Sequence, residues 1–582
     1  MEMLSGAQMV IRTLEDLGVD KLFGYPGGGV LHIYDALLES SKIKHILVRH
    51  EQGASHMADG YARATGKVGC VLVTSGPGAT NVITGIATAY ADSIPMVILT
   101  GQVATTLIGS DAFQEVDMLG ISRPIVKHSF LCKKATDIPE YIRKAFYIAS
   151  TGRPGPVVVD IPKDAQNPQL KFPYNPVPLS EISMRSYNPT TVGHRGQVKR
   201  AARMVVEAKR PILYIGGGVI ASEASAKVYD LAHRFNIPVV TTLMAIGAFP
   251  GSDELSLGML GMHGTYAANM AMHNSDLIIA LGARFDDRVT NNISKFCPEA
   301  RIIHVDIDPS SISKCVEVDV PIVGNVNTVL DQLNEALKEL EANNNIDEQR
   351  MKSDSEGWWK QINGFKQAHP LEYASDITPG LLHPAKVVEE VYKASKGDAI
   401  VVTDVGQHQM FAALYYPLEK PRRFLSSGGL GTMGYGFPAA IGAKIANPDS
   451  EVVCFTGDGS FQMNLQELAV CLQYNVPVKV IIINNRSLGM VKQWQMMFYN
   501  GRQSESYMDA VPDFVKLAES YGQVGLRVNN ESELSDVLAK AFSIHDKTVV
   551  VDIIADPDSR VYPMQIGGGS MADMFLSKTE RT

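Results

Sequence analysis

Short runs of apolar, mostly β-branched residues recur along nearly the whole chain, and segments with helical periodicity separate them. The runs lie at residues 45–48, 71–74, 96–100, 157–161, 212–215, 277–281, 301–307, 399–404, 451–457, 478–483 and 549–554. Strands that are apolar on both faces are typical of parallel sheets covered by helices on both sides. The pattern therefore predicts an α/β protein built from doubly wound parallel sheets.

Two stretches interrupt this alternation and divide the chain. Residues 167–191 contain five prolines and little periodicity, and residues 341–357 are polar and charged. We interpret both as inter-domain segments. They leave three α/β domains at 1–170, 190–340 and 370–560, followed by a C-terminal tail at 561–582 that we expect near the active site. The length of 582 residues and the ordinary globular composition agree with several domains.

Charge, apolar runs and cysteine content indicate which kinds of partner and environment to expect. Lys and Arg number 53 against 62 Asp and Glu, a net charge of −9, and neither end carries a basic run, so we expect no nucleic-acid partner. Because no run of about 18 apolar residues occurs, we expect no membrane span. The first residues show neither the basic nor the apolar region of a signal peptide, and Ser5 with Gln8 is typical of a helix capping box, so we expect this segment to be part of the fold. Six cysteines without metal-ligand spacing favour buried thiols in a reducing, cytoplasmic environment.

A candidate metal site follows two predicted strands of the third domain. Asp458 comes directly after run 451–457, within a Gly-Asp-Gly turn, and Asn485 follows run 478–483. We expect one crossover helix between these strands, so that their carboxyl ends are neighbours in the crevice where open α/β sheets bind ligands. A carboxylate, an amide oxygen and a loop carbonyl suit a Mg²⁺ that also binds phosphate. The alternative is a tight turn beside an Asn-rich loop.

The 24 residues between this turn and the Asn pair resemble the thiamine-diphosphate fingerprint, and the likeness extends along the chain. The motifs that carry it are FGYPGG, RHEQGA, SGPGATN, DAFQE, RPGPVVVDIPKD, LMAIGAFPG, LGMHG, GARFDDRVT, VGQHQM, GLGTMGYGFPAAIGA, GDGSFQMNLQEL and NNRSLGMVKQW. On these motifs the sequence resembles the catalytic subunits of the acetohydroxyacid synthase (acetolactate synthase) family, which use thiamine diphosphate and FAD in branched-chain amino-acid synthesis. The resemblance implies the three-domain architecture of thiamine-diphosphate enzymes.

The resemblance implies roles for residues of the third domain. Mg²⁺ would be held by Asp458, Asn485 and the backbone carbonyl of Ser487. The residues implied to contact the diphosphate or the rest of the cofactor are Gly406, Gln407, His408, Gly431, Gly459 and Ser460. Met433 would be the apolar wedge that bends thiamine diphosphate, although a methionine is most often core filler.

In the first domain, Glu51 stands between run 45–48 and a predicted helix. The helix dipole alone favours an acid there. The resemblance implies a catalytic role, in which the carboxyl hydrogen-bonds N1′ of the aminopyrimidine so that the 4′-amino group can remove the thiazolium C2 proton. In this family the other subunit holds the diphosphate that this acid serves. The resemblance therefore implies a homodimer or tetramer with its active site at the subunit interface.

Three further residues are implied to contact substrate. Gln114 in DAFQE and Lys163 in VVVDIPKD match family residues that line substrate access, whereas a lone Lys163 would be a solvated surface amine. Arg288, at the end of RFDDR, would pair with the carboxylate of the second substrate. The alternative is an internal ion pair of Arg288 with Asp286 or Asp287.

Trp494 is expected at the acceptor pocket. It lies nine residues after Asn485, which predicts a position about two and a half turns into a helix that leaves the metal loop. From there the indole would form a wall of the pocket for the second keto acid. The alternative is a tryptophan buried in a core or an interface.

In the middle domain, three glycines after run 212–215 resemble a nucleotide-binding turn, in which backbone N–H groups meet a phosphate. The residues whose positions resemble the FAD contacts of the family are Arg153, Gly216, Gly217, Gly218, Thr242, Leu243, Met244, His263 and Asp306. Asn325 stands where the family usually has Asp. An amide still accepts and donates hydrogen bonds, so this departure bears on the affinity for FAD rather than on the presence of the site.

The resemblance implies a carboligase that decarboxylates pyruvate and joins the two-carbon unit to a second 2-keto acid. Pyruvate as acceptor gives 2-acetolactate, 2-ketobutyrate gives 2-aceto-2-hydroxybutyrate, and FAD is structural. The alternatives are a thiamine/FAD pyruvate oxidase, a catabolic acetolactate synthase, which lacks RFDDRVT, and a non-catalytic paralogue, against which intact Glu51, Asp458 and Asn485 argue. The family usually pairs with a small regulatory subunit, which we expect as a partner.

Overall fold

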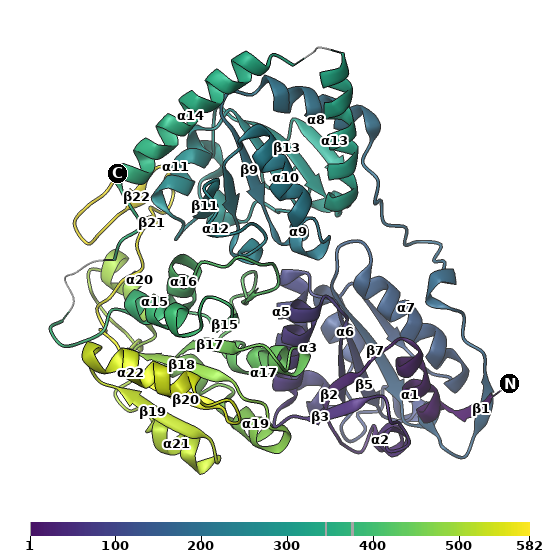
Figure 1. Ribbon diagram of the computed structural model, residues 1–582. Coiled ribbons are helices and arrows are strands. Elements are labelled where there is room, and N and C mark those ends of the chain that lie inside the picture. The colour runs from purple at the N-terminus through teal and green to yellow at the C-terminus, as the bar shows by residue number, and fades with distance from the viewer. Residues whose placement is uncertain (1, 344–345, 374–377) are drawn as a thin grey trace.

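The computed structural model describes residues 2–343, 346–373 and 378–582, and it contains three six-stranded parallel sheets with helices on both faces (Figure 1). The predicted α/β fold class is confirmed. Each apolar run named above overlaps one strand of these sheets. The three sheets lie within residues 1–170, 190–340 and 370–560, respectively.

The first sheet has the strand order β3-β2-β4-β5-β7-β6. Its strands are β2 (Lys21–Tyr25), β3 (Lys44–Leu47), β4 (Gly69–Val73), β5 (Met96–Gln102), β6 (His128–Leu131) and β7 (Pro156–Pro162). Its helices are α1 (Gly6–Asp16), α2 (Leu31–Leu37), α3 (Glu51–Thr65), α4 (Pro77–Asn81), α5 (Ile83–Asp92), α6 (Met118–Ser122) and α7 (Ile138–Ser150). The capping box of Ser5 and Gln8 at the start of α1 is confirmed.

The middle sheet has the order β11-β10-β9-β12-β13-β14. Its strands are β9 (Pro211–Ile215), β10 (Val239–Thr241), β11 (Ser256–Met259), β12 (Leu277–Leu281), β13 (Arg301–Asp306) and β14 (Val320–Val323). Its helices are α8 (Arg195–Glu207), α9 (Gly217–Ala221), α10 (Ser225–Phe235), α11 (Tyr266–Asn274), α12 (Asp287–Thr290), α13 (Val326–Ala342) and α14 (Glu348–Ala368).

The third sheet has the order β16-β15-β17-β18-β20-β19. Its strands are β15 (Ile400–Thr403), β16 (Phe424–Leu425), β17 (Val452–Gly457), β18 (Lys479–Asn484), β19 (Val524–Val528) and β20 (Val549–Ile554). Its helices are α15 (Pro384–Ala394), α16 (Gln407–Tyr415), α17 (Gly436–Ala446), α18 (Asp458–Phe461), α19 (Leu468–Tyr474), α20 (Gly489–Phe498), α21 (Phe514–Ser520) and α22 (Glu531–Phe542).

The strand orders relate the domains to one another. If strands are numbered within each domain, the first and third sheets share the order 2-1-3-4-6-5, whereas the middle sheet has 3-2-1-4-5-6. The latter is the order of doubly wound sheets that bind dinucleotides. In both orders the chain turns from one side of the sheet to the other next to the first strand of the domain, and ligands bind at the carboxyl ends of the strands there.

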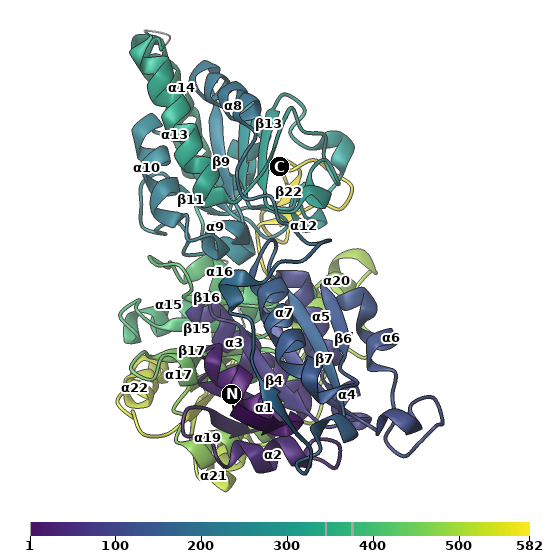
Figure 2. The ribbon, with the colours of Figure 1, turned by 90° about the vertical axis from the view of Figure 1, so that its right-hand side faces the viewer.

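Helices α3 and α17 join the first and third domains into one body, and they lie side by side in both views (Figures 1 and 2). Their backbones touch, because a Cβ on Gly60 would lie 2.1 Å from the Ala439 carbonyl oxygen and one on Gly442 would lie 2.0 Å from that of Met57. One apolar core runs through both domains at this crossing.

The two predicted inter-domain segments differ in their secondary structure. In residues 167–191, β8 (Lys171–Tyr174) pairs antiparallel with β1 (Glu2–Ser5), and the chain then runs along the edge of the molecule to the middle domain (Figure 1). For residues 341–357 the prediction of a linker is wrong. This stretch includes the end of α13 and the first half of α14, whose Trp358 and Ile362 are buried against the middle domain.

The C-terminal tail returns to the middle domain. It forms a small hairpin of β21 (Met564–Gln565) and β22 (Met574–Phe575), and Asn291 donates to the carbonyl oxygen of Ile566. Val561, where the tail begins, accepts a hydrogen bond from Gln493 of α20. Over the described ranges, no helix has the length and apolar content needed to cross a membrane.

Candidate cofactor and active site

The predicted metal residues gather at the switch point of the third sheet. Asp458 is the first residue of α18 after β17, and Asn485 follows β18. The two strands are paired, with Gly457 opposite Ile483, so the predicted neighbourhood of their carboxyl ends is confirmed. The single crossover helix is wrong, because α18, a 3₁₀ turn (Leu465–Glu467) and α19 make the connection.

The carboxylate of Asp458 is buried at the end of β17. Among the residues that the structure describes, neither of its buried carboxylate oxygens has a hydrogen-bond partner, which is costly for a charged group. Burial raises the pKa of Asp458 to about 7, although the nearby backbone N–H groups of Asp458 and Asn485 oppose the shift. No cluster of three or more His, Cys, Asp or Glu side chains capable of metal binding occurs among the described residues. The Asp458 carboxylate, the Asn485 amide oxygen and the Ser487 carbonyl are oxygen donors of the kind that Mg²⁺ takes.

The residues after β15 lie beside this carboxylate position. Gln407 begins α16, and its Oε1 accepts a hydrogen bond from Nδ2 of Asn485 at 3.4 Å. Burial lowers the pKa of His408 to about 3, so the imidazole is neutral, and its Nε2 is buried without a partner. Ser487 donates its backbone N–H to Oδ1 of Asn485 at 3.0 Å. The N-terminus of α16 and these polar groups offer donors to a diphosphate.

Asp404 fixes the segment that contains Gly431 and Met433. One carboxylate oxygen accepts the N–H of Gly434 and the other that of Gly436, each at 2.9 Å. Burial raises the pKa of Asp404 to about 6 against the effect of these N–H groups. Asn464 donates to the Gly434 carbonyl at 2.7 Å. Met433 is half-buried on this fixed segment, as an apolar support for a ligand requires.

Glu51 is the first residue of α3 and is half-buried. Its Oε2 accepts a hydrogen bond from Nδ2 of Asn81 at 2.9 Å, and Oε1 lies close to Gly78. Gln114, with a positive φ, lies against Gly76 at the start of the same α4 segment. The structure thus brings Glu51 and Gln114 to one short helix.

Within one chain, these residues are separate from the metal residues. No hydrogen bond or ion pair between described residues links Glu51 to Asp458, Asn485 or Gly431. Lys163 is exposed after β7, and its backbone N–H donates to the carbonyl oxygen of Gln102. Glu51, Gln114 and Lys163 belong to the first domain, whereas Asp458 and Asn485 belong to the third.

The predicted nucleotide turn of the middle domain lies between β9 and α9 at the switch point. The N–H groups of Gly216 and Gly218 donate to the carbonyl oxygens of Leu281 and Gly282, so these two donors are engaged within the protein. Next to Gly217 lies Met244. Thr242 directly follows β10, and its buried hydroxyl oxygen has no hydrogen-bond partner among the described residues, although buried polar groups are ordinarily hydrogen-bonded.

Other predicted middle-domain residues contact protein groups. Arg153 of the first domain pairs with Asp308 at 3.3 Å, and Asp306 accepts the backbone N–H of Asp308. His263 is buried beside the Pro563 carbonyl, and burial lowers its pKa to about 4. Asn325 caps α13, since its Oδ1 accepts N–H groups at the start of that helix. An Asp would serve this cap equally well.

Arg288 lies in α12 of the middle domain, and Trp494 lies in α20 of the third domain. Arg288 is exposed, and its closest ion-pair partner is Asp287 at 3.6 Å. Trp494 is half-buried and packs on Phe498 with 5.1 Å between ring centroids, and Phe498 in turn contacts Phe575 of the tail. Because α20 begins only at Gly489, the predicted depth of Trp494 in its helix is wrong and is about one and a half turns.

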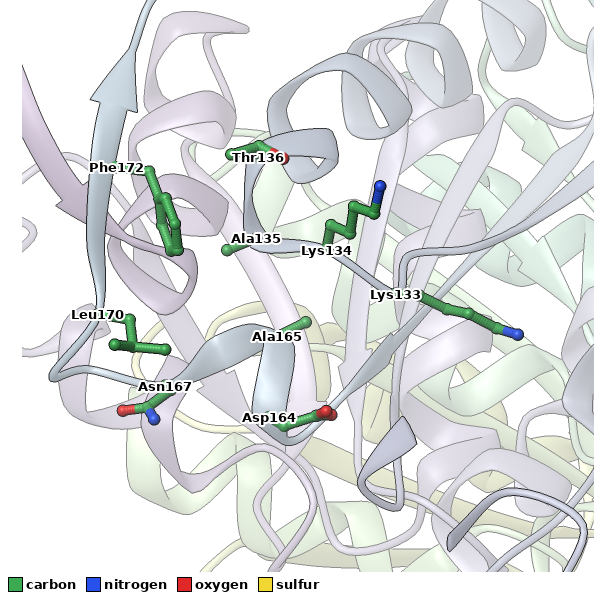
Figure 3. Close-up of a pocket in the computed structure, with 9 residues that line it drawn as sticks. All are labelled: Lys133, Lys134, Ala135, Thr136, Asp164, Ala165, Asn167, Leu170 and Phe172. Atoms are coloured by element: carbon green, nitrogen blue, oxygen red, sulfur yellow. The ribbon is translucent and has the colours of Figure 1, made fainter. Parts of the chain in front are cut away.

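A separate cavity of about 250 Å³ opens in the first domain, and Figure 3 shows the residues around it. Its lining residues are Lys133, Lys134, Ala135, Thr136, Asp164, Ala165, Asn167, Leu170 and Phe172. None of the predicted site residues lines it. Asp164 accepts the backbone N–H of Thr105, so its carboxylate is already engaged.

Three polar residues at these sites were missed in the sequence. Asn81 lies within the quoted motif SGPGATN, and Asp404 ends the apolar run 399–404 as Asp458 follows run 451–457. A search for acids directly after buried strands would have found Asp404. Asp92 contacts the Met433 segment across the domain interface, and its position in the sequence carries no such signal.

Comparisons with known proteins agree with this geometry. The family models "Thiamine pyrophosphate enzyme, N-terminal TPP binding domain", "central domain" and "C-terminal TPP binding domain" match residues 4–121, 198–333 and 404–553. The chain is 59% identical over 580 residues to the acetolactate synthase large subunit of Haemophilus influenzae, covering 100% of this chain and 99% of the relative. It is 58% identical over 584 residues to the acetolactate synthase isozyme 3 large subunit of Escherichia coli, covering all of both chains. It is 50% identical over 573 residues to the acetolactate synthase of Mycobacterium leprae, covering 98% of this chain and 90% of that protein.

Proposed function

Since the chain belongs to the thiamine pyrophosphate enzymes, and among them to the acetolactate synthase large subunits of branched-chain amino-acid biosynthesis, we propose how its residues perform that activity. The substrates we propose are pyruvate, as donor and as acceptor, and 2-ketobutyrate as the second acceptor. The products are 2-acetolactate and 2-aceto-2-hydroxybutyrate. Bound thiamine diphosphate supplies the electron sink for the decarboxylation.

The observation that carries this proposal is Asp458, whose two buried oxygens have no partner at the switch point of the third sheet. Asp458, Asn485 and the carbonyl of Ser487 would hold Mg²⁺, and the start of α16 would hold the diphosphate. The segment around Met433, fixed by Asp404, would support the rings. The side chain of Arg288 would bind the acceptor carboxylate through its exposed guanidinium.

Glu51 would hold a proton at N1′ of the aminopyrimidine. Because Glu51 has no bonded contact with the metal residues of its own chain, we propose a homodimer in which each acid serves the cofactor of the second copy. Gln114 lies beside α4 next to Glu51 and would line the entrance for substrate, as would Lys163.

The middle domain would bind FAD. The strand order of its sheet is that of dinucleotide-binding sheets. Gly217 and Thr242 lie at the switch point of this sheet, and the buried hydroxyl of Thr242 has no hydrogen-bond partner among the described residues. The carboligation consumes no electrons, so FAD would be structural.

Two relatives of this chain are named large subunits, and we propose a small regulatory subunit as its partner. Six unpaired cysteines support a reducing, cytoplasmic location.

The test is an anaerobic product assay with pyruvate, thiamine diphosphate and Mg²⁺, with and without 2-ketobutyrate and FAD. We expect acetolactate and CO₂ without any electron acceptor. Acetate that forms only when an electron acceptor is added would instead indicate a pyruvate oxidase, and a folded protein without product would indicate a non-catalytic paralogue. Glu51→Gln should lower the rate by about two to four orders of magnitude. Glu39→Gln, a surface substitution in the same domain, is the control.

A further inference from the structure

A side chain of the third domain, Glu467, forms hydrogen bonds with the first-domain backbone directly before Glu51. Glu467 ends the 3₁₀ turn between α18 and α19, and its side chain is completely buried. Its carboxylate accepts the backbone N–H of Arg49 at 3.1 Å through both oxygens, and that of His50 at 3.0 Å. These two residues connect β3 to α3. Glu467 therefore holds the two peptide N–H groups that directly precede Glu51 in the chain.

The first turn of α3 is shaped around this carboxylate. A Cβ on Gly53 would lie 2.6 Å from Oε1 of Glu467, so a larger residue at this position would push the carboxylate away. Arg49 adds a second contact across the interface, since its guanidinium donates to Gln473 of α19 at 2.6 Å. The absence of a side chain at Gly53 and the contact of Arg49 with Gln473 thus both keep Glu467 in place.

Charges around Glu467 make its protonation sensitive to Glu51. Burial raises the pKa of Glu467 to about 7, and the negative charge of Glu51 acts in the same direction. The N–H groups of Arg49 and His50 and the Arg49 guanidinium oppose this shift. The titratable groups that face Glu467 are Arg49, His50 and Glu51 from the first domain and Cys471 from α19.

We propose that Glu467 is a positioning residue for Glu51, which fixes the start of α3 and thereby the place of the Glu51 carboxyl at N1′ of the cofactor. The inference rests on the proposed role of Glu51. In the proposed homodimer, Glu51 serves a cofactor held by the second copy. Glu467 therefore connects the diphosphate-binding domain of one active site to the acid of the other.

Two substitutions distinguish the hydrogen bonds that Glu467 accepts from the negative charge of its carboxylate. Glu467→Gln removes the charge and places an amide N–H₂ against a backbone donor, whereas Glu467→Asp keeps the charge but withdraws the acceptor by one methylene. Both should lower kcat about 10- to 100-fold with little change in KM for pyruvate, since a displaced acid affects the reacting geometry and not substrate entry. Tyr474→Phe is the matched control, because it removes a hydrogen bond from the third domain to Leu47 and leaves Glu467 in place.

A readout without activity is the thermal unfolding of the cofactor-free protein at pH 5.5 and pH 8. The folded pKa of Glu467 lies above its ordinary value, so its contribution to stability is present at low pH and is lost as pH rises through about 7. We expect Glu467→Gln to show a smaller fall in Tm between the two pH values than the wild type. Glu467→Asp and Tyr474→Phe should keep the wild-type fall.

The outcomes distinguish this inference from the proposed function. If Glu51→Gln is fully active, the role of Glu51 fails, and with it the premise. If Glu51→Gln is inactive while Glu467→Gln or Glu467→Asp retains the wild-type kcat, the positioning role alone is wrong. If Glu467→Gln does not fold, the kcat of Glu467→Asp decides the question by itself.

Discussion

Asp92, the last residue of α5 in the first domain, accepts a hydrogen bond from the backbone N–H of Gly429 in the third domain at 2.6 Å. Its other oxygen accepts from the guanidinium of Arg63 at 2.7 Å, and its side chain is only 1% exposed. Thr88 of the same helix hydrogen-bonds Thr432. A side chain of the first domain, Asp92, therefore holds the backbone before Met433 in the third domain. Conversely, a side chain of the third domain, Glu467, holds the backbone before Glu51 in the first domain.

Asp92→Ala should weaken both the interface and cofactor binding. Arg63 loses a buried partner, which we expect to lower the free energy of unfolding by about 1–3 kcal/mol. The released segment should raise the apparent Kd for thiamine diphosphate, measured by quenching of protein fluorescence. Asp398→Ala, at an exposed ion pair with Lys420, should change neither quantity measurably. An unchanged Kd in Asp92→Ala would mean that Asp92 does not hold the cofactor segment.

Asp458→Asn should separate the stability of the apoprotein from ligand binding. Because the substitution removes a buried charge without partners, the cofactor-free protein should be as stable as the wild type or more stable. In the wild type, ligand at 100 times its Kd adds about 2.7 kcal/mol of stability. We expect this gain, measured as a Tm shift on adding thiamine diphosphate and Mg²⁺, to disappear in Asp458→Asn and to persist in the exposed Asp509→Asn. A normal shift in Asp458→Asn would remove this residue from the metal site.

The sequence predicts the buried strands better than the edges. Runs such as LIIAL at 277–281 coincide with a strand, because a central strand is apolar on both faces. Five of the strands that the pattern misses lie at sheet edges, such as β6 and β19, which contain polar residues and are less buried than central strands. The pattern predicts a linker at residues 341–357, which include the first half of α14, because this helix buries only Trp358 and Ile362 and is otherwise largely polar.

For the site, the sequence predicts what lies in local motifs. Asp458 and Asn485 were found because each directly follows a strand, and strand order brings those ends together. Asp92 and Glu467 were not found, because their partners are backbone N–H groups hundreds of residues away. Such contacts depend on how α3 crosses α17, which no local pattern contains.

Asp160, in the middle of the first sheet, should make stability depend on pH. Its carboxylate accepts hydrogen bonds from Thr100 and Gln102, yet burial raises its pKa to about 7. An acid with a raised folded pKa stabilises the fold below its unfolded pKa, and this stabilisation is lost as pH rises through about 7. Asp160→Asn should therefore flatten the decline between pH 5.5 and pH 8, by at most about 2 kcal/mol, because only the part of the titration between pH 5.5 and about 7 lies in this window.

Urea unfolding at both pH values measures this effect. The exposed Asp449→Asn serves as the control and should follow the wild type. If Asp160→Asn declines with pH as steeply as the wild type, the Asp160 carboxyl is not protonated in the folded protein near neutral pH.

Trp494→Leu tests the proposed wall of the acceptor pocket. Its indole packs on Phe498, which in turn contacts Phe575 of the C-terminal tail, so the ring is held in place from one side while part of it stays exposed. 2-Ketobutyrate differs from pyruvate by one methylene, and a hydrophobic wall discriminates such a difference by about 1–3 kcal/mol, or roughly 10- to 200-fold. We expect the variant to lose preference for 2-ketobutyrate while it still forms acetolactate from pyruvate.

A competition assay with both keto acids measures that preference directly as a product ratio. Trp359→Leu is the matched control, because this tryptophan lies on α14 and donates its ring N–H to the Asn236 carbonyl, within the middle domain. Loss of all activity in Trp494→Leu, with the fold intact, would assign the indole to support of the tail rather than to selectivity. An unchanged product ratio in an active variant would show that another side chain contacts the additional methylene, since a wall that touches this group cannot be replaced by a smaller one without changing the ratio.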